Sequence, residues 1–409
     1  MRAYVESYGC ALNRGEASEI EDFLRARGWD VTTTPDGADL AVLVACVVIE
    51  STERRMLRRA KALSSAPRLV VTGCLATARR DAAMTVAPSA VLIPPGDLGR
   101  LSAIVEVAGP PRHADPHEEA GFAIVPAATG CLGSCAYCIT RLARGSIRSR
   151  PPRDIAARID ELTAIGPLEI QLTSQDTAAY GLDIGTDLVR LIDRILEIEH
   201  DFRLRIGMMN PKSVLPILDG LAERFKDPRL FRFLHLPVQS ASDRLLRRMA
   251  RGHDYESFEL VVSRMRSIVP GLTLSTDIIV GYPGEAESDH DTNLSMIRTI
   301  RPDIVNITRF SPRPGTKAAR QDPKVHGRVV KRRSRELTRA RFEIAQENNE
   351  RLIGRTIDAL ATEKGRGSST VLRSDAYKQV VVGGQVPLRT YRSVLITGAT
   401  PTHLLGELA

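Results

Sequence analysis

The sequence predicts an α/β protein with three parts: an N-terminal parallel α/β sheet domain, a central incomplete (β/α)6 barrel and a small C-terminal β-barrel. Short β-branched runs alternate with helix-like stretches over residues 1–108, which is typical of a parallel sheet. A strand-then-helix pattern repeats six times over residues 122–326, which favours a barrel. Gly-punctuated β-rich runs fill residues 355–409 with almost no helix signal. A chain of 409 residues can give each part its own core.

Composition is that of an ordinary globular protein, with 43% hydrophobic and 26% charged residues, which excludes a disordered or fibrous class. The longest apolar run, residues 40–49, is half the length that a bilayer span needs. The N-terminus lacks the pattern of a secretory signal. We therefore expect a cytoplasmic protein with no membrane partner, in which six cysteines favour metal or redox use over disulfides.

In the N-terminal domain, a cysteine follows each of three predicted strands. Cys10, Cys46 and Cys74 end or follow the runs AYVESYG, LAVLVAC and RLVVTGC. Because open parallel sheets bind ligands at the carboxyl ends of their strands, we expect these three cysteines to converge on one edge. Taken alone, they would be better explained as small buried hydrophobic residues at strand ends.

The central barrel follows a Pro-, Gly- and charge-rich linker at residues 108–121 and carries the strongest local signal. Cys131, Cys135 and Cys138 follow the first barrel strand with Cys-x3-Cys-x2-Cys spacing. Three thiolates on one tight loop can hold a [4Fe–4S] cluster through three irons. The fourth iron would keep an open position, which marks a catalytic rather than a structural metal site.

Positive charge is concentrated in one segment. The chain carries a formal net charge of +8, whereas residues 309–341 contain twelve Lys or Arg and two acids, so the remainder sums to about −2. A basic linking helix at residues 327–354, beside a small β-barrel, favours contact with RNA phosphates over a merely solvated helix face. The candidate RNA contacts are Lys331, Arg332, Arg333, Arg335 and Arg339.

The cysteine triple resembles that of the radical S-adenosylmethionine superfamily, including an aromatic residue, Tyr137, before the last cysteine. Six further motifs, in order and spacing, resemble the methylthiotransferase family. They are YGCALN, ACVVIESTERRM, TGCL, LTSQDTAAYG, HLPVQSASDRLLRRM and STDIIVGYPGE, and the triple itself is followed by ITRLARGSIRSRP. The C-terminal β-rich part is similar to a TRAM domain, an RNA-binding module, so the resemblance covers nearly the whole chain.

The resemblance implies two [4Fe–4S] clusters and S-adenosylmethionine as cofactors. Cys131, Cys135 and Cys138 would hold the cluster that generates a 5′-deoxyadenosyl radical. The N-terminal cysteines Cys10, Cys46 and Cys74 would hold an auxiliary cluster whose open iron carries the sulfur to be inserted. One S-adenosylmethionine would methylate that sulfur and another would supply the radical that removes hydrogen from the substrate carbon. We expect an electron donor such as flavodoxin or ferredoxin.

Within the family, ACVVIESTERRM, LTSQDTAAYG and LARG most resemble the branch that converts N6-threonylcarbamoyladenosine beside the anticodon to its 2-methylthio form. This resemblance implies that the anticodon loop of tRNA is the partner, and single-stranded RNA loops expose bases for entry into a pocket. The sequence departs from the family twice: Ala45 precedes Cys46 where an Asn-Thr pair is common, and Ala241 follows Gln239 and Ser240 where Gly is usual. Neither departure removes a cluster ligand.

Polar residues at the barrel strands are candidates for cofactor contacts, although ordinary hydrogen bonds or a structural ion pair would explain them as well. In the N-terminal domain, Asn13 is expected either to cap the next helix or to contact substrate. The candidate cofactor contacts are Tyr137, Ser174, Gln175, Asp176, Arg205, Gln239 and Asp277.

Two other functions stay open at this point. The first is methylthiolation of another tRNA adenosine or of a ribosomal-protein side chain, and the basic helix and the nucleoside-branch motifs disfavour the protein substrate. The second is a non-enzymatic RNA-binding protein that holds zinc through the cysteine triple, with His113 or His117 as the fourth ligand. Metal identity separates the second function from an iron–sulfur enzyme.

Overall fold

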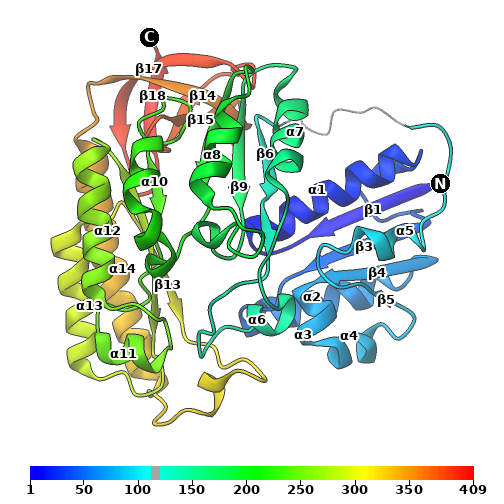
Figure 1. Ribbon diagram of the computed structural model, residues 1–409, viewed down its shortest axis with the longest axis horizontal. Helices are drawn as coiled ribbons and strands as arrows, with labels where there is room; N and C mark the ends of the chain where they lie inside the picture. The colour runs from blue at the N-terminus through cyan, green and yellow to red at the C-terminus, as the bar shows by residue number, and fades with distance from the viewer. Residues whose placement is uncertain (112–119) are drawn as a thin grey trace. The chain divides into compact units, whose positions relative to one another are not determined.

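The computed structural model describes residues 1–111 and 120–409 (Figure 1). Most of the predicted linker, together with His113 and His117, lies outside the described residues. The chain forms two compact units. The first combines the described residues up to 111 with segments 128–148 and 311–319, and the second contains the rest. All six cysteines therefore belong to the first unit.

The first unit is built on a five-stranded parallel sheet with strand order β2-β1-β3-β4-β5. The central strand β3 is buried along its whole length because helices cover both faces of the sheet. This arrangement confirms the predicted parallel α/β sheet. The strands are β1 (Arg2–Ser7), β2 (Asp30–Thr32), β3 (Leu40–Ala45), β4 (Arg68–Gly73) and β5 (Val91–Leu92).

Two apolar cores, one on each face of this sheet, give the first unit three layers. On one face, Leu24, Trp29 and Val42 belong to a core that α1 and α5 cover. On the other face, Leu43 and Met56 belong to a core shared with α2, α3, α4 and α6. The helices are α1 (Ala11–Ala26), α2 (Glu50–Leu63), α3 (Cys74–Ala78), α4 (Arg80–Val86), α5 (Leu98–Ser102) and α6 (Thr140–Arg144).

The second unit contains a six-stranded partial barrel, as predicted. Its strands form two parallel three-stranded sheets with orders β10-β9-β6 and β11-β12-β13, and a bridge from Leu204 to Leu230 lies between them. The strands are β6 (Phe122–Pro126), β9 (Leu168–Thr173), β10 (Phe202–Ile206), β11 (Phe233–His235), β12 (Thr273–Val280) and β13 (Ile304–Arg309). Two short strands, β7 (Ala128–Thr129) and β8 (Arg148–Ser149), flank the loop of the cysteine triple in the sequence.

Helices cover the outside of the partial barrel (Figure 1). In α8, Leu188, Leu191 and Ile195 share one buried face, and the Asp187 side chain caps the helix by accepting from the Arg190 amide. None of the helices within the described ranges is long and apolar enough to cross a membrane. The helices are α7 (Pro152–Thr163), α8 (Leu188–Leu196), α9 (Pro211–Val214), α10 (Leu218–Arg224), α11 (Asp243–Arg248), α12 (Tyr255–Ile268), α13 (Glu287–Ile300) and α14 (Gly327–Glu350).

The C-terminal part of the second unit is a closed five-stranded barrel with strand order β14-β15-β16-β18-β17. All its pairs are antiparallel except β16 with β18. Ala361, Leu372 and Val380 lie in its core, so the predicted small β-barrel is confirmed. The strands are β14 (Thr356–Lys364), β15 (Ser369–Ser374), β16 (Gln379–Gly383), β17 (Tyr391–Ala399) and β18 (Leu404–Leu408).

The turn between β15 and β16 packs Tyr377 against residues of the partial barrel. The Tyr377 ring centroid lies 4.9 Å from that of Phe231 and 4.8 Å from that of Phe233. The Tyr377 hydroxyl donates to the Glu169 carboxylate over 2.7 Å, and the Arg205 guanidinium lies 5.1 Å from the Tyr377 ring. Burial raises the pKa of Glu169 and of Tyr377. Tyr377 thus joins the two barrels through both packing and a buried hydrogen bond.

Substitution of Tyr377 is expected to destabilise the second unit. Tyr377→Ala removes a packed ring and leaves Glu169 without its hydroxyl partner, and we expect it to lower the free energy of unfolding by roughly 3 kcal/mol. Tyr377→Phe keeps the ring and should lower that free energy by about 1–2 kcal/mol. Urea unfolding followed by circular dichroism measures both effects, and an unchanged midpoint for Tyr377→Ala would contradict this packing.

Candidate functional site: two cysteine triplets

Cys10, Cys46 and Cys74 lie at the carboxyl edge of the N-terminal sheet. Cys46 and Cys74 directly follow Ala45 and Gly73, which are register partners in β3 and β4. Cys10 precedes the first residue of α1 and is exposed, whereas Cys46 and Cys74 are buried. The structure therefore places the three cysteines at one edge of the sheet, as the sequence predicted.

Gly9 allows the chain beside Cys10 to approach Cys46 closely. Its φ of 120° is unfavourable for other residues. A Cβ atom at this position would lie 2.5 Å from the Cys46 Cβ and 3.0 Å from the Cys46 Sγ. The space beside the Cys46 sulfur is therefore open only because residue 9 has no side chain.

Burial makes the ionised forms of the Cys46 and Cys74 thiols unfavourable without a positive partner. Burial raises the pKa of Cys46, and it raises the pKa of Cys74 to about 12 against the lowering effect of Arg144. Cys10 and Cys46 raise the pKa of Cys74 further because ionised thiols close together repel one another. A cationic group bound by the three thiolates would stabilise their ionised forms. An iron–sulfur cluster is such a group.

Arg144, the last residue of α6, is buried beside Cys74. Its Nε donates to the Cys74 Sγ over 3.4 Å, and its Nη2 donates to the Asn13 Oδ1 over 2.9 Å. Its two Nη atoms lie 2.5 and 2.8 Å from the two carboxylate oxygens of Glu16. Burial alone would lower the pKa of Arg144, but its bonds with Glu16 raise that pKa, so the residue stays charged.

Arg313 is a second buried arginine of the first unit, and it comes from segment 311–319. Its guanidinium pairs with the Glu53 carboxylate, which also accepts from the Arg79 Nε over 2.7 Å. Burial lowers the pKa of Arg313, while Glu50 and Cys46 raise it. The Cys46 and Cys74 thiols thus have two buried guanidinium groups, those of Arg144 and Arg313, in their electrostatic surroundings.

The second triplet lies on a tightly held loop. The Cys131 amide donates to the Gly145 carbonyl over 3.2 Å, and the Cys138 amide donates to the Cys135 carbonyl over 3.1 Å. The Arg141 guanidinium donates to the Gly145 carbonyl over 3.0 Å and to the Cys131 carbonyl. Backbone and side-chain hydrogen bonds therefore fix the ends of the loop.

Gly133 leaves room between two sulfurs of this loop. A Cβ atom at residue 133 would lie 3.4 Å from the Cys131 Sγ and 3.7 Å from the Cys135 Sγ. Its amide also donates to the Cys131 Sγ over 3.2 Å. Amide donors to cysteine sulfur and space between thiolates both suit an iron–sulfur cluster.

Both triplets fit clusters by the chemistry of their donors, which are thiolates only. Among the described residues, no three Cys, His, Asp or Glu side chains form a ligand set for a single metal ion. A [4Fe–4S] cluster does not need three side chains around one ion, because each thiolate binds a separate iron. The two thiolate triplets, each beside a glycine that leaves space, are suited to such clusters.

Ser174, Gln175 and Asp176 follow β9 in the second unit. Asp176 is buried and accepts from the Asn210 amide over 3.0 Å and from the Ser213 hydroxyl over 2.7 Å, and burial raises its pKa. The Gln175 Oε1 atom is buried without a hydrogen-bond partner in the part of the chain that the structure describes. Gln175 is thus the member of this loop whose side chain best remains open to a cofactor.

The other predicted cofactor contacts of this unit have structural partners of their own. The Asp277 Oδ1 lies 3.2 Å from the His235 Nε2 and accepts from the Asn306 amide group over 2.7 Å. Gln239 has a φ of 74° and exchanges backbone hydrogen bonds with β12. Arg205 lies 5.0 Å from the Phe233 ring. Cofactor contact by these residues stays a prediction, as it does for Tyr137 in the cysteine loop of the first unit.

The basic residues predicted to contact RNA divide into two sets on α14. Arg333 is buried, and it pairs with Glu285 over 2.9 Å and with Glu287 over 2.8 Å, so it fastens α14 to the start of α13 and to the segment before it. We therefore withdraw Arg333 from the predicted RNA contacts. Arg332 is exposed but also pairs with Glu287. The exposed residues Lys331, Arg335 and Arg339 keep that prediction.

Sequence reasoning missed several residues of these sites. Asn13 does not cap α1, because Cys10 occupies the N-cap position and the buried Asn13 amide donates to the Tyr8 carbonyl over 3.1 Å. Arg144 was part of the LARG motif but was given no role. Its partner Glu16 lies 128 positions away, so no local pattern links the two. His235 stood in the HLPVQS motif, which was the available signal for its pairing with Asp277.

Comparison with known families agrees with this arrangement. Residues 125–296 match the model of the Radical SAM superfamily. Residues 2–93 match a family described as uncharacterized protein family UPF0004. The two matched ranges contain the second and the first cysteine triplet, respectively.

Curated relatives match the chain over its full length. A probable threonylcarbamoyladenosine tRNA methylthiotransferase from Pyrococcus abyssi is 38% identical over 100% of this chain and 99% of its own length. A relative of the same name from Methanothermobacter thermautotrophicus is 36% identical with the same coverage. The Xenopus laevis threonylcarbamoyladenosine tRNA methylthiotransferase is 33% identical over 93% of this chain and 72% of its own length. The chain belongs to this methylthiotransferase family.

Solved structures show that this methylthiotransferase shares its fold with other radical enzymes. The radical S-adenosylmethionine methyltransferase TsrM from Kitasatospora setae superposes with a TM-score of 0.57 at 14% identity, covering 78% of this chain and 76% of its own. The cobalamin-dependent S-adenosylmethionine radical enzyme OxsB gives a TM-score of 0.52 at 13% identity, covering 85% of this chain and 56% of its own. At these identities the likeness shows the fold alone.

Proposed function

We propose that the protein is a tRNA methylthiotransferase that converts N6-threonylcarbamoyladenosine beside the anticodon to its 2-methylthio form. The observation that carries this proposal is the presence of two separate thiolate triplets in one compact unit. A radical enzyme without sulfur insertion would need only the loop triplet. The relatives' names supply the substrate.

The loop triplet has the role of holding the cluster of the radical S-adenosylmethionine superfamily. That cluster, with bound S-adenosylmethionine, supplies the radical that removes hydrogen from an unreactive carbon. Cys131, Cys135 and Cys138 hold three irons, and the hydrogen bonds of Arg141 keep their loop closed at its ends.

The N-terminal triplet has the role of holding an auxiliary [4Fe–4S] cluster that carries the sulfur to be inserted. Cys10 is exposed, while Cys46 and Cys74 are buried, so the site opens toward solvent on the side of Cys10. Gly9 keeps the space beside the Cys46 sulfur free. An accessible face is required for the substrate carbon to reach the sulfur.

Metal analysis tests the two-cluster proposal and separates it from the zinc alternative. After anaerobic reconstitution, we expect about eight irons and eight acid-labile sulfides per chain, as two cubane clusters require. About four irons would leave one triplet without a cluster and contradict the auxiliary site. Stoichiometric zinc without iron would contradict the radical mechanism and favour a zinc-containing RNA-binding protein.

Binding of tRNA is assigned to the exposed face of α14 and to the C-terminal barrel, which we propose is a TRAM domain. Lys331, Arg335 and Arg339 project from exposed positions of α14, and Leu337 and Ala340 on the opposite face are buried. An anticodon loop offers both phosphates for these cations and splayed bases for the active site. We propose that the enzyme acts in the cytoplasm and receives electrons from a donor such as flavodoxin or ferredoxin.

The triple variant Lys331→Ala, Arg335→Ala, Arg339→Ala is expected to weaken tRNA binding without loss of either cluster. Each lost phosphate contact lowers the slope of log K against log salt by roughly 0.7–0.9, so the slope should fall by about 2. Filter binding at several salt concentrations measures it. The matched control replaces Arg153, Arg190 and Arg194, exposed on α7 and α8, with alanine. Equal losses in both variants would contradict a binding face on α14.

A further inference from the structure

Arg144 is a buried cation whose hydrogen-bonding capacity is fully used. Its side chain is 0% exposed and that of Glu16 is 4% exposed. Five hydrogen bonds match the five N–H groups of the guanidinium, and their acceptors are Cys74 Sγ, Asn13 Oδ1, Thr129 Oγ1 and both carboxylate oxygens of Glu16. Burying such a pair is expensive in solvation energy, and well-packed apolar residues often stabilise a fold as well or better. Stability alone therefore does not explain why Arg144 and Glu16 are buried as an ion pair.

The position of Arg144 in the chain connects the two triplets. It lies six residues after Cys138, at the end of α6, and α6 packs on the core that contains Cys74. Its partners Asn13 and Glu16 lie on the first turns of α1, directly after Cys10. From the helix that follows the other triplet, one guanidinium thus contacts both Cys74 and the helix that follows Cys10.

The contact with Cys74 differs from the others in kind. Glu16 satisfies the charge of Arg144 through a bidentate pair, which fixes the plane of the guanidinium and leaves the Nε–H aimed at the Cys74 Sγ. A hydrogen bond to a cysteine sulfur withdraws electron density from it. Such bonds raise the reduction potential of an iron–sulfur cluster.

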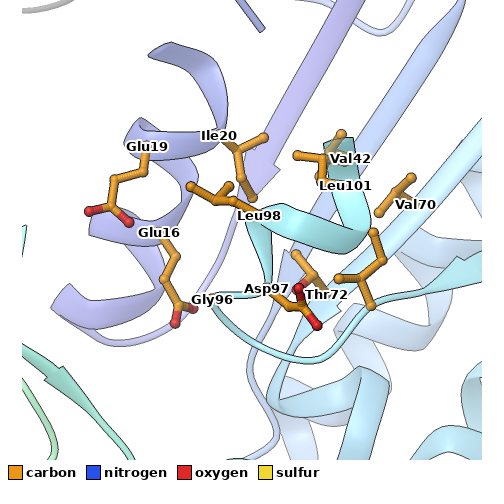
Figure 2. Close-up of a pocket in the computed structure, with 11 residues that line it drawn as sticks. Glu16, Glu19, Ile20, Val42, Val70, Thr72, Gly96, Asp97, Leu98 and Leu101 are labelled. Carbon is orange, nitrogen blue, oxygen red and sulfur yellow. The ribbon is translucent and has the colours of Figure 1, made fainter. Parts of the chain in front are cut away.

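Glu16 also lines a small cavity in the first unit. It has a volume of about 20 Å³ and is lined by Glu16, Thr72, Gly96, Asp97 and Leu98, among others. Figure 2 shows the Glu16 carboxylate at the side of Gly96, where an added Cβ would lie 3.5 Å from the Glu16 Oε1.

We propose that Arg144 is a positioning residue for the auxiliary site: held by Glu16 and Asn13, it donates a hydrogen bond to the Cys74 sulfur and raises the reduction potential of the cluster bound there. This inference rests on the proposed auxiliary cluster. The five N–H groups of Arg144 donate to Cys74, Asn13, Thr129 and Glu16 and leave none for the loop cysteines, so the effect should be confined to the auxiliary cluster.

The test isolates the auxiliary cluster in a parent variant in which Cys131, Cys135 and Cys138 are all alanine. Its midpoint potential is measured by a redox titration followed by electron paramagnetic resonance. Adding Arg144→Met removes the hydrogen bond, and Arg144→Lys keeps the charge but not the planar donor. We expect both additions to shift the potential to more negative values at unchanged iron content. An unchanged potential in either variant would overturn the inference.

Two further measurements keep the outcomes distinct. In a second parent, Cys10, Cys46 and Cys74 are all alanine, and only the loop cluster is present. Adding Arg144→Met to this parent should leave the potential of the loop cluster unchanged. An equal shift of that potential would show a general structural effect and overturn the inference. In the first parent with Arg144 in place, ¹⁵N-labelled arginine should give a hyperfine coupling to the reduced cluster. Absence of this coupling would also overturn the inference. A first parent that binds no iron would instead contradict the proposed auxiliary cluster itself.

Discussion

Cys131→Ala is expected to abolish both reductive cleavage of S-adenosylmethionine and formation of the methylthio nucleoside. In the proposed assignment the loop would hold three irons through three thiolates, and loss of one would remove the geometry that keeps a single iron open. Formation of 5′-deoxyadenosine measures the cleavage, and mass spectrometry of tRNA nucleosides measures the modification. Both should fall to the level of the chain without iron.

A matched control for this variant lies in the same loop. Leu132 is exposed beside Cys131 and none of its atoms is a metal ligand, so Leu132→Ala should leave both products nearly unchanged. Substantial cleavage by Cys131→Ala would contradict the assignment of the loop triplet. Equal loss in the Leu132→Ala variant would show that the loop conformation, rather than the thiolate, was being measured.

Cys10→Ala is expected to separate the two activities. The variant should still cleave S-adenosylmethionine, because the loop triplet is intact, but it should form no methylthio nucleoside. Cys10 is the best choice among the auxiliary cysteines because it is exposed, whereas Cys46 and Cys74 are buried in the core and their replacement also disturbs packing. The measurement is the ratio of methylthio nucleoside to 5′-deoxyadenosine in one reaction.

The exposed position of Cys10 also makes the opposite outcome decisive. A Cys10→Ala variant that folds like the parent and methylthiolates normally would show that the N-terminal triplet does not hold the sulfur-carrying cluster. Loss of S-adenosylmethionine cleavage together with methylthiolation would show that the two triplets do not act separately.

The sequence was informative wherever a short-range pattern decides the structure. Strand periodicity and β-branched runs predicted the strands of both units, and parallel strands bring their carboxyl ends together, which placed Cys10, Cys46 and Cys74 at one edge. The spacing of Cys131, Cys135 and Cys138 fits on one loop, so it could be recognised without knowing the rest of the fold.

Features that depend on long-range contacts could not be predicted from the sequence. The Arg144–Glu16 pair joins residues 128 positions apart, and His235 meets Asp277 because β11 and β12 are neighbours in the sheet. Local net charge predicted a basic helix, but a count of charges does not show that Arg333 forms ion pairs with Glu285 and Glu287. Asn13 suited a helix cap by residue type, yet the helix begins earlier, at Ala11.

The most direct test of the account is mass spectrometry of nucleosides from tRNA that carries N6-threonylcarbamoyladenosine, after incubation with the reconstituted protein, S-adenosylmethionine, sulfide and a reductant. The account predicts that this nucleoside declines and that a nucleoside heavier by one sulfur and one methylene group replaces it, only when S-adenosylmethionine is present. The contradicting result concerns protein that holds both clusters and cleaves S-adenosylmethionine. If such protein left N6-threonylcarbamoyladenosine unchanged and modified another adenosine or a ribosomal protein instead, the proposed substrate would be wrong.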